Sequence, residues 1–222
     1  MRVKSIYRLA HNTTSMKMSD IAIIAFAVIL IGAILVVIGN HLLGDNLGDL
    51  DEGQARTLAQ QELEYSYPNA EVNIYSLENS TGTWKIKGKV IYGAGTACPN
   101  LTIVELHYPR FGFVPREQVI TSNCSVLGCK DNPNCLIAYE EEAVIISRER
   151  NSIPSLESFL SGVSPADLSV NASFHSSYQS EKMNQTYPEV WVVDWKDTES
   201  KSVFTVVLNN TGGGAVASYY KS

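Results

Sequence analysis

One stretch of the chain carries no charge over 18 residues, IAIIAFAVILIGAILVVI at positions 21–38. As a helix rising about 1.5 Å per residue, it would be roughly 27 Å long, which is enough to cross the hydrocarbon core of a bilayer. A helix in the core of a soluble protein would show one polar face, and this stretch shows none. The sequence therefore predicts a single transmembrane helix within residues 19–41, with the lipid bilayer as a partner through residues 21–38.

The charges on either side of this segment predict its orientation. The basic residues before it are Arg2, Lys4, Arg8 and Lys17. No lysine or arginine follows it until Arg56, whereas acidic residues begin at Asp45. Because basic flanks stay in the cytoplasm, we expect a cytoplasmic tail at residues 1–18 and an extracellular remainder at the plasma membrane. The segment is longer than the apolar part of a signal peptide, so a retained signal anchor is favoured over cleavage near Gly39.

The predicted extracellular part is strongly acidic. The chain has 222 residues, which allows a membrane segment and one or two small domains. The part after residue 38 holds 13 of the 17 basic residues and 22 of the 23 acidic residues, a net charge of −9. Such a surface repels the phosphate backbone of DNA and RNA, so nucleic acid is excluded as a partner.

Sequons for N-linked glycosylation are frequent after the apolar segment. The pattern N-x-[S/T], with x not proline, occurs at Asn79, Asn100, Asn123, Asn171, Asn184 and Asn209. The serine and threonine content predicts about two such patterns by chance, so the sequons are in excess. A glycan is bulky and must project from the surface, and we predict glycosylation at these positions. A composition rich in serine, threonine and asparagine is the alternative explanation. Asn12 also matches, but it lies in the predicted cytoplasmic tail.

The cysteines support the same extracellular address. All four lie after the apolar segment, at Cys98, Cys124, Cys129 and Cys135. An even number in an oxidising compartment predicts two disulfides, for which three pairings are possible. If 101–108 and 117–123 form a hairpin, its ends bring Cys98 near Cys124, and Cys129 and Cys135 would close a small loop. Zinc is the alternative, but the spacings C-x4-C and C-x5-C lack the C-x2-C that metal sites favour.

The extracellular part is predicted to be an α+β structure of two similar units, at residues 42–137 and 138–222. In each unit a helix would cover one face of a curled antiparallel sheet. The predicted helices are at 49–67, 139–150 and 154–162, and the predicted strands are at 70–78, 83–92, 101–108, 117–124, 167–175, 189–196, 201–208 and 215–220. Asp49 and Glu52 resemble a capping box at the start of the first helix, and Pro68 ends it. The repeated order of helix and four strands suggests an internal duplication.

Alternation along the last strands predicts which side chains are buried. The residues expected to face the covering helix of the second unit are Val190, Val192, Phe204 and Val206. Trp191 and Trp195 would share the other face of the sheet and pack against the first unit.

The C-terminal pattern, VWVVDW followed by KSVFTVVLNNTGGGAV, resembles the last strands of PepSY-like domains within the broader cystatin-like group. The matching positions are Trp191, Val193, Val203, Val206 and residues 211–216. Asn210 stands where the family has Asp or Asn before its Thr-Gly turn. The first unit matches more loosely, through residues 50–66 and 84–92, and its cysteine-bearing insert at 93–135 departs from the family pattern. The resemblance implies an extracytoplasmic, often membrane-tethered, non-catalytic domain that regulates peptidases or senses at the cell envelope.

No motif points to catalysis, to a metal or to a cofactor, so we predict that the chain is not an enzyme and needs no cofactor. Only His107 and His175 could join an extracellular site, and each falls in a predicted strand, where a single histidine is more often structural. Three consecutive carboxylates are Glu140, Glu141 and Glu142. They are expected to start a helix, where the helix dipole favours them, and the spacing of a calcium loop is absent. The glycines at 211–214 are predicted to form a hairpin turn.

Together these features predict a single-pass, membrane-anchored extracytoplasmic module that binds or regulates a partner in the cell envelope. The alternative is a structural subunit of a surface filament, similar to type IV pilins, with a glycosylated β-rich head. Against it, no basic-Gly processing site precedes Ile21, and the glutamate expected early in such a helix is missing. A hydrolase with a scattered site is a third and weaker interpretation. Sequon density fits an archaeal cell surface, with a eukaryotic secretory-pathway protein as the alternative.

Overall fold

The computed structural model describes residues 50–80, 82–108, 115–180 and 182–221. All of these belong to one compact unit that spans Leu50–Ser222. The predicted cytoplasmic tail at 1–18 and the apolar segment at 21–38 lie outside the described residues. The predicted division at residue 137 stays a prediction.

The described residues correct the predicted fold class, an α+β chain led by a transmembrane helix. They form mainly antiparallel sheet, with three short α-helices. These helices are α2 (Glu52–Ser66), α3 (Glu140–Glu149) and α4 (Pro154–Gly162). No helix in the described part of the chain is long and apolar enough to cross a membrane. The physical reason for the sheet-rich class is that long hairpins, rather than helices, supply most of the buried apolar side chains.

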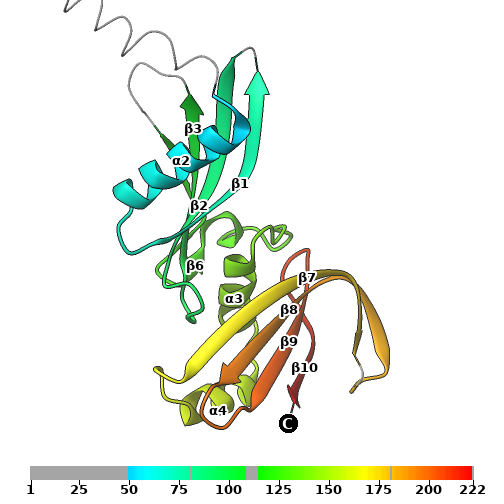
Figure 1. Cartoon of the computed structure of the whole chain (residues 1–222). Helices are drawn as coiled ribbons and strands as arrows, with labels where there is room; N and C mark the ends of the chain where they lie inside the picture. The colour runs from blue at the N-terminus through cyan, green and yellow to red at the C-terminus, as the bar shows by residue number, and fades with distance from the viewer. Residues whose placement is uncertain (1–49, 81, 109–114, 181, 222) are drawn as a thin grey trace, which may run out of the picture. The chain divides into compact units, whose positions relative to one another are not determined.

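The first sheet has four antiparallel strands in sequential order, with α2 against one face (Figure 1). Its strands are β1 (Glu71–Ser80), β2 (Thr83–Tyr92), β3 (Asn100–Tyr108) and β4 (Arg116–Val119). Helix α2 buries Ala55, Ala59 and Leu63, which recur at helical spacing, against apolar side chains such as Ile86. Gly88 in β2 allows this close approach, because a Cβ atom there would lie 2.7 Å from Leu63 Cδ1.

The N-cap of helix α2 lies two residues after the predicted cap, Asp49. Asp51 is the N-cap, and its carboxylate accepts a hydrogen bond from the Gln54 backbone N–H at 2.8 Å. The Gln54 side chain accepts in return from the Asp51 N–H at 3.2 Å, which completes a capping box. The helix ends at Ser66, ahead of Pro68, as predicted.

The second sheet is also antiparallel, with strand order β10-β9-β8-β7. Its strands are β7 (Leu168–Ser180), β8 (Gln185–Asp197), β9 (Val203–Asn209) and β10 (Ala215–Lys221). Helices α3 and α4 cover one face of it, and Ile145, Leu156 and Phe159 are among the side chains they bury there (Figure 1). Pro154 lies in the first turn of α4, where its missing N–H costs no helical hydrogen bond.

Helices α3 and α4 cover the face of the second sheet that carries Trp191 and Trp195, called here the tryptophan face. The prediction had placed these two tryptophans on the face away from the helices and is therefore wrong. The side chains on the tryptophan face include Trp191, Val193, Trp195, Phe204 and Val206. Those on the opposite face include Val190, Val192 and Val207. The prediction placed Val192 with Val206, whereas the register pairs Val192 with Val207. Trp191 and Trp195 therefore pack against α3 in their own half of the chain, and not against the first sheet.

The opposite face is also buried, because the hairpin of β7 and β8 curls over it (Figure 1). Strands β7 and β10 are the two edges of the sheet, yet the Tyr178 and Tyr219 hydroxyls hydrogen-bond to one another. Lys182 Nζ also donates to the Tyr220 carbonyl at 2.6 Å. Pairing is irregular at the bend, where Glu189 has a φ of 46°. The register is the same on both sides of Glu189, so no residue is inserted, and the left-handed backbone there accompanies the bend.

The two predicted disulfides are confirmed in the segment between the sheets, as Cys98–Cys124 and Cys129–Cys135. This segment contains β5 (Thr121–Ser122), β6 (Ser125–Val126) and the 3-10 turn η1 (Leu127–Cys129). Asn123 and Cys124 connect β5 to β6 with φ values of 51° and 57°. Both are in the left-handed region, as in a tight hairpin turn, which asparagine tolerates better than cysteine does.

Arg150 ties the small Cys129–Cys135 loop to the turn between β9 and β10. It lies just after α3, and its guanidinium donates to the carbonyls of Cys129, Asn132 and Gly212. The neighbouring Asn151 donates to the Gly213 carbonyl at 2.9 Å. A planar guanidinium can serve several carbonyls at once, which an ammonium cannot do in the same geometry. Arg150 therefore fixes the loop and the turn together.

We expect Arg150→Met to lower the free energy of unfolding by about 1–2 kcal/mol, because three carbonyls lose a charged donor in a partly exposed site. Arg150→Lys should recover only part of this loss. Urea unfolding of the full chain in mild detergent measures both values. Lys130→Met, on the exposed part of the same loop, serves as the control. An Arg150→Met loss no larger than that of the control would contradict the role of Arg150.

Candidate functional site

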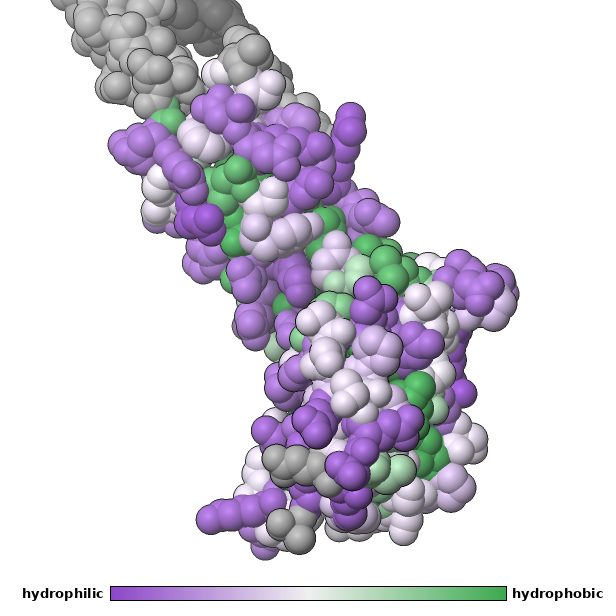
Figure 2. Space-filling view, turned by 90° about the vertical axis from the view of Figure 1, so that its right-hand side faces the viewer, coloured by the Kyte–Doolittle hydropathy of each residue, from purple (hydrophilic) through white to green (hydrophobic). Residues whose placement is uncertain are grey.

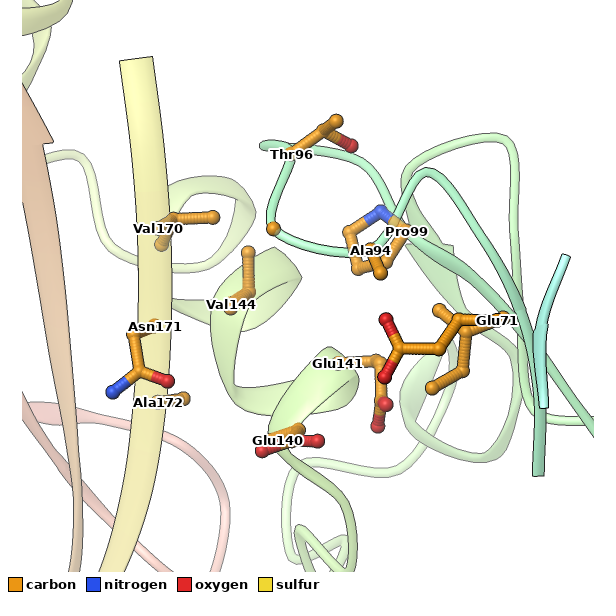
Figure 3. Close-up of a pocket in the computed structure, with 12 residues that line it drawn as sticks. Glu71, Ala94, Thr96, Pro99, Glu140, Glu141, Val144, Val170, Asn171 and Ala172 are labelled. Atoms are coloured by element: carbon orange, nitrogen blue, oxygen red, sulfur yellow. The ribbon is translucent and has the colours of Figure 1, made fainter. Parts of the chain in front are cut away.

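A cleft of about 200 Å³ lies between the first sheet and the layer formed by α3 and β7 (Figure 3). Its polar lining includes the carboxylates of Glu71, Glu140 and Glu141, and Asn171. Its apolar lining includes Ile91, Ala94, Pro99, Val144, Val170 and Ala172. The loop after β2 closes one side, where the Val170 N–H donates to the Gly95 carbonyl at 3.1 Å. Residues from five separate parts of the chain therefore meet at this cleft.

Glu141 is the most unusual side chain in the cleft. It is the second residue of α3, and only 5% of its side chain is exposed. Lys89 Nζ lies 3.5 Å from Glu141 Oε2, yet this oxygen has no hydrogen-bond partner among the described residues. The two observations agree, because an ion pair at that distance does not provide a well-formed hydrogen bond. Burying a carboxylate with so little compensation is costly, which marks this position as a candidate for function.

Lys89 is the cation that faces these carboxylates from β2. Its ammonium lies 3.8 Å from Glu140 Oε1 and 5.0 Å from the centre of the Tyr139 ring. Only 18% of the Lys89 side chain is exposed, whereas 51% of the Glu140 side chain is exposed. One ammonium group therefore lies beside the carboxylates of the cleft.

Glu71 adds a third carboxylate from the start of β1. Figure 3 shows its side chain extending into the cleft, above the carboxylate of Glu141. No ion pair or hydrogen bond to the Glu71 side chain is found within the described residues. The three carboxylates that line the cleft belong to Glu71, Glu140 and Glu141. The ammonium of Lys89 lies beside two of them, so the local charge is negative.

Glu142, the third of the consecutive glutamates, has a structural role instead. Its Oε2 accepts hydrogen bonds from the Ala138 N–H at 2.7 Å and the Tyr139 N–H at 3.0 Å. These bonds cap the start of α3, as expected for a glutamate in the first turn. Burial raises the pKa of Glu142, and the two backbone hydrogen bonds oppose that rise. Only Glu140 and Glu141 are left to face the cleft.

Burial also raises the pKa of Glu141 above its ordinary value of 4.5, although the attraction of Lys89 opposes the shift. The folded state therefore binds this proton more tightly than the unfolded state does. The stability from protonation is present at low pH and is lost as pH rises through the raised pKa. Glu141→Gln mimics the protonated form, so we expect it to raise the Tm at pH 7 by about 2–4 °C, which corresponds to about 1 kcal/mol.

The Tm difference between Glu141→Gln and wild type should shrink as the pH falls toward about 4, where wild-type Glu141 is also protonated. Thermal unfolding of the full chain at a series of pH values measures it. Glu140→Gln removes a half-exposed carboxylate from the same turn and is the matched control. A Glu141→Gln variant with a lower Tm than wild type at pH 7 would contradict this prediction.

All six sequon asparagines are exposed in the structure. They lie in or beside strands of both sheets, and Asn123 lies in the β5–β6 turn. Exposure leaves room for a glycan at each position. Asparagines outside sequons, such as Asn69 and Asn132, are exposed as well, so glycosylation stays a prediction. Asn171 is the one sequon residue that lines the cleft.

His107 and His175, the two histidines considered for a site, lie apart from the cleft, in different sheets. His107 Nε2 is 2.7 Å from Glu105 Oε1, and Glu105 Oε2 is 3.2 Å from Lys85 Nζ. His175 Nε2 is 3.0 Å from Ser173 Oγ on the second sheet. In the part of the chain that the structure describes, no group of three or more His, Cys, Asp and Glu side chains could hold a metal ion.

Sequence reasoning noticed two members of the cleft but not the cleft itself. Glu140 and Glu141 stood out as consecutive carboxylates at a helix start. Glu71 and Lys89 belong to strands of the other sheet, and no spacing in the sequence connects them with α3. Locally, the alternation along β2 showed only that Lys89 lies on the face of the strand opposite to α2.

Comparisons with protein-family models, with curated proteins and with solved structures gave no match. The resemblance to PepSY-like domains therefore stays a prediction from the sequence pattern.

Proposed function

We propose that this chain is an extracytoplasmic binding module of the cell envelope, held at the plasma membrane by its apolar segment 21–38, with the N-terminus in the cytoplasm. The acidic cleft is the site where it binds a partner protein. The observation that carries this proposal is the buried carboxylate of Glu141, a residue that lines the cleft and whose Oε2 has no hydrogen-bond partner among the described residues. The proposal gives the PepSY-like resemblance its expected role, recognition without catalysis.

The disulfides support the extracytoplasmic address. Bonds of this kind persist in oxidising compartments and are rare in the cytosol. Both bridges lie within residues 98–135, beside two of the exposed sequons, Asn100 and Asn123. The Asn123 N–H donates to the Asn100 side chain at 3.2 Å. These two predicted glycosylation sites are therefore neighbours on the surface.

The character of the surface supports recognition through charge. On the face seen in Figure 2, hydrophilic residues predominate and hydrophobic residues form small separate patches. A surface of this kind lacks the broad apolar area of an obligate subunit interface on that side. Acidic groups that converge on a small cleft provide specificity and a fast association rate instead.

The proposal is tested in native cells with a benzophenone amino acid at Thr96, an exposed residue that lines the cleft. Irradiation should join the full chain to one partner, and Glu71→Gln/Glu141→Gln should remove that adduct. The same photoreactive residue at Glu199, in the exposed turn between β8 and β9, is the control for general surface proximity. The intact, unreduced mass of the chain from its membrane should show both disulfides and added sugar.

Each outcome decides between named alternatives. An adduct at Thr96 that depends on both glutamates supports the binding module. An adduct with a second copy of the same chain would favour the filament subunit. Adducts only at Glu199, or reduced cysteines in the native protein, would overturn the proposal.

A further inference from the structure

We propose that the acidic cleft takes a lysine side chain from the partner, with its ammonium group beside the carboxylates of Glu71 and Glu141. This inference rests on the proposed binding function and specifies the chemistry of the group that is bound. It is carried by the buried, incompletely paired Glu141 and by the balance of charges around it.

The charges leave room for one more cation. Lys89 is shared between Glu140 and Glu141, at 3.8 and 3.5 Å, and Glu71 has no ion-pair partner among the described residues. An ammonium group donates three hydrogen bonds and accepts none, which matches a set of unused carboxylate oxygens. A second cation would supply the donor that Glu141 Oε2 lacks and would reduce the cost of its burial.

The chain already holds one ammonium group next to these carboxylates. Lys89 of β2 lies beside the cleft, against the Tyr139 ring, with most of its side chain buried. A lysine buries its methylene stem along apolar surface while its charged end reaches a polar group. The apolar walls of the cleft, such as Ile91, Val144 and Val170, suit such a stem.

The size of the cleft favours a single side chain over a larger ligand. Its volume of about 200 Å³ is below the roughly 300–1,000 Å³ of typical small-molecule pockets. A divalent metal is disfavoured, because none of the described His, Cys, Asp and Glu side chains form a group of three that could hold one. A guanidinium is planar and wider, whereas an ammonium is compact and needs no flat opening.

Calorimetric titration of the full chain in lipid nanodiscs tests this inference with small probes. We expect Nα-acetyl-lysine methylamide to bind in the millimolar range and Nα,Nε-diacetyl-lysine methylamide, which lacks the charge, to bind at least tenfold more weakly. Glu71→Gln/Glu141→Gln should weaken lysine binding at least tenfold, whereas Glu199→Gln should leave it unchanged. The comparison of the two probes on the wild-type chain decides the matter even if the double variant does not fold.

Two further probes distinguish the source and the kind of cation. Tighter binding of n-pentylamine than of the lysine amide would overturn a protein side chain in favour of a free alkylamine. Tighter binding of Nα-acetyl-arginine methylamide would overturn the preference for an ammonium. If no cationic probe binds, the lysine inference fails, whereas the binding module stands as long as the Thr96 adduct still depends on Glu71 and Glu141.

Discussion

Replacing Trp195 with alanine is expected to lower the free energy of unfolding by about 3–5 kcal/mol. Trp195 is fully buried on the face of the second sheet that α3 and α4 cover. Its indole N–H donates to Ser147 Oγ at 3.2 Å, and that hydroxyl donates to the Val144 carbonyl at 2.7 Å. Alanine would leave a large cavity beside α3 and would remove a buried hydrogen bond. Urea unfolding of the full chain in mild detergent, followed by far-UV circular dichroism, measures the loss.

Two variants separate the contributions to this effect. Ser147→Ala removes only the hydrogen bond to the indole and should cost about 1 kcal/mol. Trp84→Ala removes a tryptophan near the start of β2 that is only partly buried and whose N–H donates to the Leu50 carbonyl at 3.1 Å. It should therefore cost less than Trp195→Ala. The opposite order would show that the second core does not depend on its tryptophan face.

The positions of most strands and helices could be predicted from the sequence, because local signals agree with the fold there. Strand β2 occupies residues 83–92 and α4 occupies 154–162, as predicted. Alternating polarity determined the first, and a proline in the first turn determined the second. The predicted start of the first helix was wrong because two acidic residues, Asp49 and Asp51, each offered a plausible N-cap.

The burial pattern of the second sheet could not be predicted in the same way. Alternation identifies a buried face only when the other face is polar. Both faces of β8 are apolar, since Trp191 and Trp195 face the helices while Val190 and Val192 face the curled hairpin. The bend coincides with a left-handed backbone at Glu189, which is not a glycine and gave no turn signal.

The cleft was beyond sequence reasoning for a different reason. Its charged residues, Glu71, Lys89, Glu140 and Glu141, are brought together by the packing of two sheets, and their distances along the chain carry no motif. The disulfides, in contrast, followed from an even cysteine count and a predicted hairpin. Predictable features are thus those that depend on neighbours in sequence, and the candidate site depends on tertiary contacts.

Removing the Cys98–Cys124 bridge is expected to have the second large effect. In the chain-entropy description, closing a loop over a separation of 26 residues stabilises the folded state by about 3.5 kcal/mol. Closing the separation of 6 residues at Cys129–Cys135 should contribute only about 2.2 kcal/mol. We therefore expect C98S/C124S to be less stable than C129S/C135S by about 1 kcal/mol in urea unfolding of the full chain.

The backbone at Cys124 permits a test of how this bridge acts. Its φ of 57° costs a residue with a side chain about 1–2 kcal/mol, and glycine adopts it freely. C98S/C124G should therefore be more stable than C98S/C124S by about 1 kcal/mol, although both lack the bridge. If the two variants unfold at the same urea concentration, the bridge does not hold a strained turn in place. If C98S/C124G equals wild type, the relief of the backbone at residue 124 offsets the whole contribution of the cross-link, which would then be only about 1–2 kcal/mol.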